Sequence, residues 1–303
     1  MKAILPVAGY GTRLHPHTHH IQKSLLPIAG KPTLDFIVEP LLAHGIKDIT
    51  FIVGHLGDQI RDYMKSFSGA FHFVEQKERL GLGHAVLQGL TDSDEPVLIQ
   101  LGDTIFHADF MSFCSSDVNR IAVMEVDDPT RFGIVETEGN RVIALHEKPK
   151  YPPSNLAISG LYSFISERKL KEAIEYLIEQ NIRTGGEYQL TDAMAFMLKN
   201  GNPFEVRKLD YYDTGVPATF LDTNRALLKS SHKEFSNCTI VDPVHIGIGC
   251  RIENSTIGPN VTIMSKCTIM NCTIENSVVL QGSALINQSF ASRIVGGDGS
   301  EYC

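Results

Sequence analysis

An apolar segment at the start of the chain runs directly into a basic loop that contains glycines. Residues 2–8 are mostly apolar, and Gly9, Gly11 and Arg13 follow at once. Because a glycine has no Cβ, the chain can turn sharply there and bring backbone N–H groups close to an anion. Arg13 adds a planar, permanently charged guanidinium, and Lys23 follows nearby. These residue types at this spacing predict a phosphate-binding loop.

The loop differs in spacing from two common phosphate-binding motifs. Gly9 and Gly11 lead into Thr12 and Arg13. They therefore match neither the dinucleotide fingerprint GxGxxG nor the P-loop GxxxxGK[ST]. The loop alone therefore does not identify a ligand, and the motifs that follow it in the sequence are needed.

Further motifs occur in a fixed order along the first three quarters of the chain. They are 8–14, Lys23 with 26–28, Gln76 with 81–85, 101–103, 131–136, 147–149, 159–162, 186–192 and 213–215. In this ordered set of motifs, the chain resembles the sugar-1-phosphate nucleotidyltransferase family, particularly its glucose-1-phosphate thymidylyl- and uridylyltransferase branches. Where the family commonly has proline before the loop lysine, this chain has Gln22, which predicts a more mobile loop.

The resemblance implies attack of a sugar 1-phosphate oxygen on the α-phosphorus of a nucleoside triphosphate, with release of pyrophosphate. A phosphate monoester has its second pKa near 6, so the nucleophile is already mostly dianionic and needs no strong base. The enzyme's main task is then to align two anions and to neutralise their repulsion. The catalytic cations that the resemblance implies are Arg13 on the triphosphate, Lys23 near the reacting centre and Lys148 on the sugar phosphate.

The resemblance also implies binding residues for the two substrates. For the nucleotide these are Ala8, Gly9, Gly11, Thr12, Gln76 and Gly81; for the sugar they are Gly133, Glu147, Gly160, Tyr162 and Glu187. The Gln76 amide could pair with uracil or thymine, so dTTP and UTP both remain open. Glu147 could instead pair with a neighbouring cation, and Tyr162 could be a core residue. His84 could be catalytic or a packing residue.

Asp103 and Asp213 match the positions at which the family binds Mg²⁺. Carboxylate oxygens from one or two side chains suit this cation when phosphate oxygens complete its coordination. As structural alternatives, Asp103 could cap the end of a strand, and Asp213 could be a turn residue. Asp192 is interpreted as structural, near the start of a helix.

Apolar strands alternate with helical segments through residues 1–232, which predicts an α/β nucleotidyltransferase domain. The domain is expected to have a doubly wound, mainly parallel, Rossmann-like sheet, with residues 97–101 as a central strand. Segments 121–126, 133–136 and 142–147 are interpreted as an antiparallel insertion, and residues 167–181 as an amphipathic helix.

Residues 233–303 show a different periodicity. Isoleucines recur every six residues with two steps of five, at positions 240, 246, 252, 257, 263, 269 and 274, and small or turn-forming residues fill the gaps. This pattern predicts a short hexapeptide-repeat β-helix of about three coils, left-handed if it follows the relatives. A small irregular β domain is the alternative.

Composition limits the possible partners. The 303-residue chain has a net charge of −8, which argues against nucleic acid as a partner. No apolar run approaches the roughly 20 residues that span a membrane, so a cytoplasmic enzyme with small-molecule substrates is expected. The six cysteines form no CxxC pair and are expected to be reduced. The histidines at 15, 17, 19 and 20 could bind a metal, but a hydrated cluster is the simpler interpretation.

The sequence bears on two rival functions. A non-catalytic regulatory subunit would keep the fold but would usually have lost phosphate- or metal-binding residues. Here the residues at those positions are all present: Arg13, Lys23, Asp103, Lys148 and Asp213. An acyl-transferring β-helix would need a deeper cleft and more bases than His245 alone. An assembly role for the β-helix, in a homo-oligomer, is the favoured interpretation.

Overall fold

The computed structural model describes residues 1–115, 117–296 and 301–302. Contacts divide the chain into two compact units, each made of two stretches of sequence. The first unit contains residues 1–9 and 37–211, and the second contains residues 10–36 and 212–303. The basic loop is therefore grouped with the β-helix rather than with the sheet. The predicted domain boundary at 232/233 remains a prediction.

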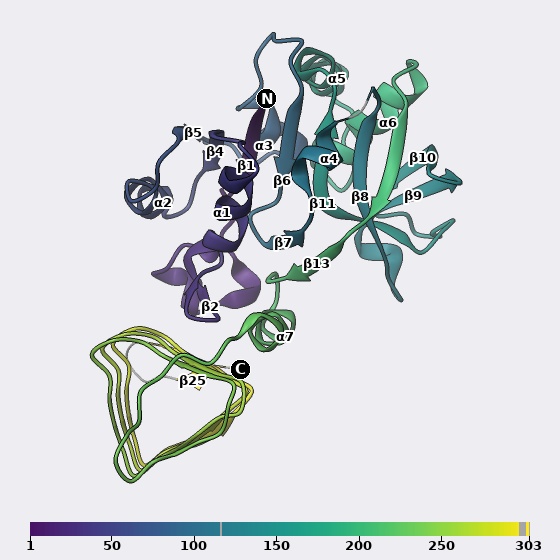
Figure 1. Cartoon of the computed structure of the whole chain (residues 1–303). Coiled ribbons are helices and arrows are strands. Elements are labelled where there is room, and N and C mark those ends of the chain that lie inside the picture. The colour runs from purple at the N-terminus through teal and green to yellow at the C-terminus, as the bar shows by residue number, and fades with distance from the viewer. Residues whose placement is uncertain (116, 297–300, 303) are drawn as a thin grey trace. The chain divides into compact units, whose positions relative to one another are not determined.

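A nine-stranded sheet forms the centre of the first unit (Figure 1). Its strands are β1 (Lys2–Pro6), β4 (Asp48–Val53), β5 (Ala70–Glu75), β6 (Val97–Gln100), β8 (Asn119–Glu125), β9 (Gly133–Glu138), β10 (Arg141–Glu147), β11 (Leu156–Phe164) and β12 (Phe204–Lys208). They lie in the order β5-β4-β1-β6-β11-β8-β12-β10-β9. The first four strands are parallel to one another, as is the pair β8 and β12, and the remaining pairs are antiparallel.

This topology confirms the α/β fold but corrects one detail. The segments interpreted as an insertion, which become β8, β9 and β10, belong to the main sheet. The nine-residue strand β11 causes the difference, because it pairs with β8 along one edge and with both β6 and β9 along the other. Local alternation of apolar residues indicated antiparallel pairing correctly but could not show that β11 links both parts.

Helices cover both faces of this sheet. The α-helices of the chain are α1 (Asp35–Ala43), α2 (Gly57–Met64), α3 (Leu82–Leu87), α4 (Phe110–Cys114), α5 (Glu167–Glu179), α6 (Leu190–Lys199) and α7 (Pro217–Leu227). Helices α3, α5 and α6 share one core with Ile4 of β1. Ala3 and Leu5 face the opposite side of the sheet and are also buried. Burial on both faces explains why β1 is apolar at consecutive positions.

Short elements complete the two units. They are the 3₁₀ helices η1 (Thr12–Leu14), η2 (His17–His19), η3 (Lys23–Leu25) and η4 (Pro129–Arg131), and the strands β2 (Pro27–Ile28), β3 (Lys31–Pro32), β7 (Thr104–His107) and β13 (Asp210–Asp213). Strands β2 and β3 form a tight antiparallel hairpin. This hairpin lies in the second unit, a few residues after Lys23.

The second unit contains the predicted parallel β-helix (Figure 1). Its strands are β14 (Thr239–Ile240), β15 (Val244–Ile246), β16 (Arg251–Glu253), β17 (Thr256–Ile257), β18 (Val261–Ile263), β19 (Thr268–Met270), β20 (Thr273–Glu275), β21 (Val278–Val279), β22 (Ala284–Ile286), β23 (Ser289–Ala291) and β24 (Ile294–Val295). A further strand, β25 (Glu301–Tyr302), pairs antiparallel with β24. The predicted isoleucines stack in register from coil to coil: Ile240 on Ile257 on Ile274, Ile246 on Ile263, and Ile252 on Ile269. Their side chains form the core of the β-helix.

Other sequence expectations concern thiols, metals and membranes. Five described cysteines are free thiols, whereas Cys303 lies outside the described residues. Among the residues that the structure describes, no cluster of three or more His, Cys, Asp or Glu side chains could hold a metal ion. Within the same residues, no helix has the length and apolar character that a membrane span requires.

Candidate active site

The predicted phosphate loop is folded into consecutive short turns of the second unit. Gly11 has φ +65° and precedes η1, which carries Thr12 and Arg13. A Cβ on Gly11 would lie 2.9 Å from Cγ2 of Thr18 and 3.1 Å from Cβ of Lys23. The Thr18 hydroxyl also donates to the Gly11 carbonyl over 2.9 Å. Glycine is therefore required at this turn, and the Lys23 stem lies against the loop that carries Arg13.

Gln22 restrains the turn that carries Lys23. Its side chain is buried, and its Oε1 accepts a hydrogen bond from the Ser24 amide over 2.6 Å, as the N-cap of η3. A proline in this place would limit φ, whereas Gln22 holds the next turn through a hydrogen bond. The sequence indicated only the lost proline and not this contact.

Asp213 also lies in the second unit, at the end of β13. Its Oδ1 accepts a hydrogen bond from the Gly215 amide over 2.8 Å, and its carbonyl accepts one from the Thr223 hydroxyl over 2.7 Å. A Cβ on Gly215 would lie 2.9 Å from that same Oδ1. The turn therefore fixes the orientation of the carboxylate, so the turn interpretation of Asp213 is compatible with metal ligation.

The remaining predicted nucleotide residues lie in the first unit, beyond the carboxyl ends of parallel strands. Ala8 follows β1, and a Cβ on Gly54, just after β4, would lie 2.8 Å from the Ala8 carbonyl oxygen. A Cβ on Gly9 would meet no described atom within 4 Å. Gly9 therefore borders open space, as expected where a ligand approaches the backbone.

Gln76 is buried directly after β5. Its Nε2 donates to the Gly81 carbonyl over 3.4 Å and lies 3.4 Å from Nδ1 of His84. His84 thus contacts the amide predicted to read the base, which supports an orienting role for the imidazole over direct catalysis.

Gly81 is required by a neighbouring segment rather than by a ligand. It has φ +114°, and a Cβ there would lie 2.6 Å from the Tyr188 carbonyl oxygen and 2.8 Å from Cβ of Glu187. The Tyr188 amide donates to the Leu80 carbonyl over 2.7 Å, and the Gly83 amide donates to the Tyr188 carbonyl over 2.9 Å. Predicted nucleotide and sugar segments are therefore hydrogen-bonded to each other.

Two predicted ligand-binding carboxylates of the first unit lie near Tyr162. The Tyr162 side chain is buried, and this burial raises the pKa of its hydroxyl well above the usual value. The nearby carboxylates of Glu147 and Asp103 raise that pKa further. Tyr162 is therefore both a core residue and a neighbour of two predicted ligand-binding carboxylates.

Close packing explains the other two glycines of the sugar site. A Cβ on Gly133 would lie 2.7 Å from Oγ1 of Thr191 and 3.1 Å from Oε2 of Glu147. Gly160 has φ +102°, and a Cβ there would lie 2.9 Å from Cδ1 of Leu101. Gly133 therefore lies beside the Glu147 carboxylate, whereas Gly160 accommodates a neighbouring core side chain.

Lys148 adjoins the same carboxylate. Its Nζ lies 3.3 Å from Oε1 of Glu147, whose side chain is only 7% exposed. Lys148 has φ +42°, a backbone conformation that is uncommon for residues other than glycine. The predicted alternative, a pair between Glu147 and a neighbouring cation, is therefore present, and that cation is itself a predicted catalytic residue.

Sequence reasoning did not identify the cluster that supports Glu187. Oε2 of Glu187 accepts a hydrogen bond from Nε2 of Gln189 over 2.9 Å. The Arg183 guanidinium donates to the Tyr188 hydroxyl over 2.9 Å and to the Asn181 side chain over 2.9 Å. Arg183 and Asn181 precede the recognised motif, and only their position directly before it could have indicated a supporting role.

Two acidic side chains fit a magnesium site by their chemistry. Asp103 and Asp213 provide hard oxygen donors, and Mg²⁺ is commonly held by one or two carboxylates together with substrate phosphates. Asp103 follows β6 in the first unit, and Asp213 lies in the second.

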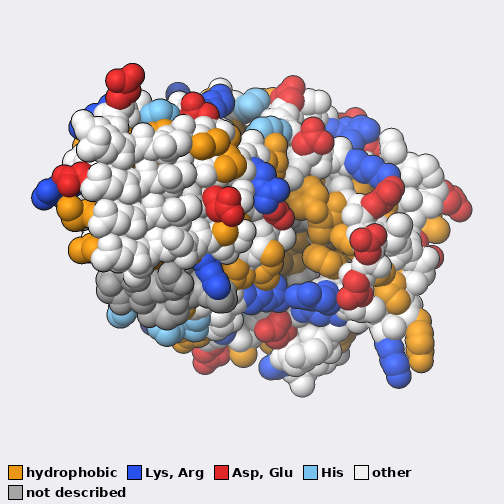
Figure 2. Space-filling view, turned by 90° about the horizontal axis from the view of Figure 1, so that it is seen from below, with side chains coloured by type: hydrophobic (Ala, Val, Ile, Leu, Met, Phe, Trp, Pro, Cys, Tyr) orange, Lys and Arg blue, Asp and Glu red, His pale blue; other side chains and the backbone are white. Residues whose placement is uncertain are grey.

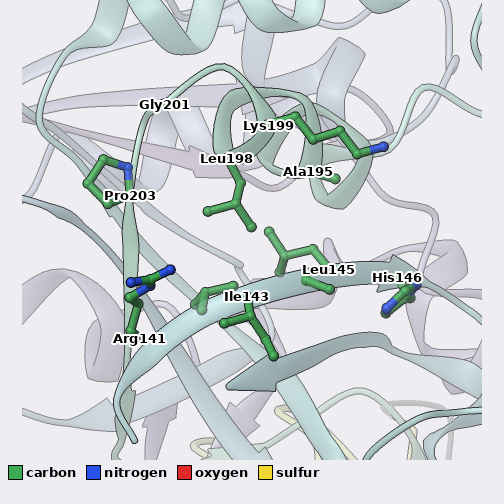
Figure 3. Close-up of a pocket in the computed structure, with 11 residues that line it drawn as sticks. Arg141, Ile143, Leu145, His146, Ala195, Leu198, Lys199, Gly201 and Pro203 are labelled. Atoms are coloured by element: carbon green, nitrogen blue, oxygen red, sulfur yellow. The ribbon is translucent and has the colours of Figure 1, made fainter. Parts of the chain in front are cut away.

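A separate hollow of about 650 Å³ lies between β10 and α6 (Figure 3). Ile143, Leu145 and Leu198 form its apolar lining, and Arg141 and Lys199 extend from its two sides. None of the predicted site residues lines it. On the face of the molecule shown in Figure 2, basic and acidic side chains are intermingled, in keeping with the net charge of −8.

Comparison with known proteins identifies the family. A family model described as "Nucleotidyl transferase" matches residues 2–230, so the chain belongs to the nucleotidyl transferase family and is an enzyme of that class. The "Glucose-1-phosphate thymidylyltransferase" of Streptomyces antibioticus is 31% identical over 94% of this chain and 88% of its own length.

Two further relatives extend the comparison. "Low-salt glycan biosynthesis nucleotidyltransferase Agl11" of Haloferax volcanii is 34% identical over 95% of this chain and 90% of its own length. A solved UDP-glucose pyrophosphorylase in complex with UDP-glucose is 26% identical, with a TM-score of 0.65 over 74% of this chain and 97% of that structure. These matches confirm the predicted family and fold.

Proposed function

We propose that this chain transfers a nucleoside monophosphate from dTTP or UTP to a sugar 1-phosphate, with glucose 1-phosphate as the acceptor, and releases pyrophosphate. The family match over residues 2–230 is the observation that carries the proposal. The relative named as a glucose-1-phosphate thymidylyltransferase supports dTTP as a substrate, and the solved UDP-glucose pyrophosphorylase supports UTP. Both names support glucose 1-phosphate as the acceptor. The regulatory-subunit alternative lacks support, since the charged residues of the motifs are intact.

The reaction forms one P–O bond and breaks another. An oxygen of the sugar phosphate attacks the α-phosphorus, and the bond to the β-phosphate breaks as pyrophosphate leaves. Lys148 holds the sugar phosphate, Arg13 binds the triphosphate and the departing pyrophosphate, and Lys23 stabilises charge at the reacting phosphorus. Asp103 and Asp213 are the residues that would hold Mg²⁺, which would supply positive charge to neutralise the phosphates.

Recognition of the two substrates is assigned to different segments. Backbone atoms of Ala8, Gly9, Gly11 and Thr12 approach the phosphates, and Gln76 with Gly81 reads the pyrimidine. Glu147 accepts hydrogen bonds from sugar hydroxyls, and Gly133, Gly160, Tyr162 and Glu187 complete the sugar site. Support comes from the contacts of Gly133 and Tyr162 with the Glu147 region and from the hydrogen bonds between the segments of Gly81 and Glu187.

We further propose a cytoplasmic homo-oligomer that binds neither nucleic acid nor membranes. Free thiols at the five described cysteines suit a reducing compartment. The negative net charge opposes binding to nucleic acid.

A panel of nucleoside triphosphates assayed with glucose 1-phosphate tests the function by pyrophosphate release. We expect release with dTTP or UTP, none when the sugar phosphate is omitted, and loss of activity with EDTA that Mg²⁺ restores. Full activity without divalent ions would contradict the metal assignment. No release with any pyrimidine triphosphate would instead favour the regulatory subunit.

A further inference from the structure

The turn of the β2–β3 hairpin adopts an uncommon backbone conformation. Ala29 and Gly30, which connect the two strands, have φ +47° and +91°. Positive φ at consecutive residues is typical of the tightest hairpin turns, and glycine adopts it easily. Ala29 is not a glycine, so its conformation depends on contacts with its surroundings.

One buried side chain of α7 holds this turn. Asn224 is 1% exposed, and its Oδ1 accepts hydrogen bonds from the Ala29 amide over 2.9 Å and from the Thr262 hydroxyl over 2.7 Å. Its Nδ2 lies 3.4 Å from the Asn260 carbonyl oxygen, to which it donates. Thr262 and Asn260 belong to the β-helix. Asn224 therefore joins the hairpin turn to the β-helix through a buried polar network.

A second contact restrains the same turn. A Cβ on Gly30 would lie 2.6 Å from Cε1 of His245, a residue of β15. The imidazole thus packs directly against the Gly30 backbone. Two independent contacts therefore hold the turn, one with Asn224 of α7 and one with His245 of β15 in the β-helix.

A ladder of hydrogen bonds extends from this turn to Lys23. Beyond β2 and β3, the Thr33 amide donates to the Leu26 carbonyl over 3.0 Å, and the Leu34 amide donates to the Ser24 carbonyl over 2.8 Å. Ser24 follows Lys23 directly. A displacement of the hairpin would therefore move the backbone that carries Lys23.

We propose that Asn224 is a positioning residue, which uses the first coils of the β-helix to hold the hairpin and thereby Lys23 in place for nucleotidyl transfer. The inference rests on the proposed function, because it takes Lys23 to act at the reacting phosphorus. The β-helix accordingly has a role within its own subunit, in addition to any role in assembly.

Two substitutions disrupt the hydrogen bonds of Asn224, one in α7 and one in the β-helix. Asn224→Leu removes both hydrogen bonds that Oδ1 of Asn224 accepts, and Thr262→Val removes the hydroxyl that donates one of them. We expect each to lower kcat about tenfold with both KM values within about twofold, because a misplaced Lys23 weakens the transition state more than substrate binding. Thr262→Ser keeps the hydroxyl and should restore kcat.

Ser255→Ala is the matched control for lost β-helix stability. The Ser255 hydroxyl is also buried and hydrogen-bonded, to the Glu253 carbonyl and the Cys272 amide, within the β-helix. We expect this variant to lower the melting temperature without changing kcat. An equal loss of kcat in Ser255→Ala would overturn the proposal, since it would show a general effect of destabilisation.

Hydrogen exchange separates failure of the inference from failure of the proposed function. Amides of residues 22–34 should exchange faster in Asn224→Leu and Thr262→Val than in the wild type or Ser255→Ala. Unchanged exchange would show that Asn224 does not hold the hairpin, whatever the activity. Faster exchange with unchanged kcat would show that the hairpin does not position a catalytic group. Absence of transfer by the wild type itself would refute the proposed function and leave only the structural contact.

Discussion

At the scale of single residues, similar glycines serve different purposes. Gly9 borders open space, where a ligand can approach the backbone, but a Cβ on Gly81 or Gly160 would collide with protein atoms. Gly133 differs again, because its Cβ would reach the Glu147 carboxylate. Substitutions at these positions should therefore impair different steps: folding at Gly81 and Gly160, and sugar binding at Gly133.

Arg13→Ala should lower kcat/KM by roughly 10²–10³-fold, about 3–4 kcal/mol of transition-state stabilisation, because it removes the charge proposed to stabilise the leaving pyrophosphate. Arg13→Lys should recover part of this loss, since it restores charge without the planar fork. Steady-state pyrophosphate release measures both. Arg251→Ala, which removes an exposed arginine paired with Glu253, is the control and should leave activity unchanged.

Gly133→Ala should raise the KM for the sugar phosphate about tenfold, roughly 1.4 kcal/mol, with little change in the KM for the triphosphate. The added Cβ would lie 2.7 Å from Oγ1 of Thr191, 2.9 Å from Cδ1 of Ile158 and 3.1 Å from Oε2 of Glu147, so these neighbours, the carboxylate included, must shift. Gly139→Ala is the matched control, because Gly139 has φ +61° and open surroundings. It should cost about 1 kcal/mol in unfolding free energy without changing either KM. A sugar KM unchanged in Gly133→Ala would contradict the assignment of the sugar site.

At the scale of elements, the β-helix is stabilised by repeated corners. Asn254, Asn271 and Asn287 occupy equivalent corners with φ between 48° and 57°, which asparagine tolerates better than most residues. Nδ2 of Asn271 donates to Oδ1 of Asn287 over 2.9 Å. The coils thus form a rigid support beside which the hairpin and α7 pack in the second unit.

The contact between this support and the hairpin should depend on pH. Burial lowers the pKa of His245 below its ordinary value near 6.5. The unfolded chain therefore binds more protons between the two pKa values, so the stabilisation present above about pH 6.5 decreases as the pH falls towards the folded pKa. Melting temperatures measured against pH should decrease more steeply below pH 6.5 for the wild type than for His245→Gln. Parallel curves would show that His245 does not titrate on unfolding.

At the scale of the whole molecule, the chain has a net charge of −8 although its proposed substrates are anions. Anionic substrates can still bind when cations gather locally, and surrounding acidic groups oppose nonspecific anions. Of the five charged residues predicted to act on the phosphates, Arg13, Lys23 and Asp213 belong to one compact unit, and Asp103 and Lys148 belong to the other.

Light scattering at micromolar concentration should give a multiple of the 33.5 kDa chain mass. Strands β22 and β23 each pair on one side among the described residues, and Ile286 of β22 is 54% exposed. Open edges and an exposed apolar side chain favour pairing with another subunit. Ile286→Lys should shift the mass towards the monomer. A monomeric wild type would count against assembly through this end.

The sequence predicted much of the fold because the relevant signals are local. Apolar runs marked β1 and β6, helical spacing marked α5, and the six-residue isoleucine period marked the β-helix. The interpretation of β8, β9 and β10 as an insertion was wrong, because these strands belong to the main sheet. Strand β11 joins them to β6, and this pairing involves residues distant in sequence. The loop 10–36 shows the same limit, because no local pattern indicated that it is grouped with the β-helix.

By itself, the sequence determined the family, the types of charged group and the positions at which they occur, because these depend on residue identity and short spacing. Only the tertiary structure decided which groups meet. Asn224 reaches Ala29 across 195 positions of the chain, and Tyr162 lies near carboxylates from two other segments. Such contacts arise when separate elements pack around a shared core, where burial and hydrogen bonding, rather than neighbouring residues, select the partners.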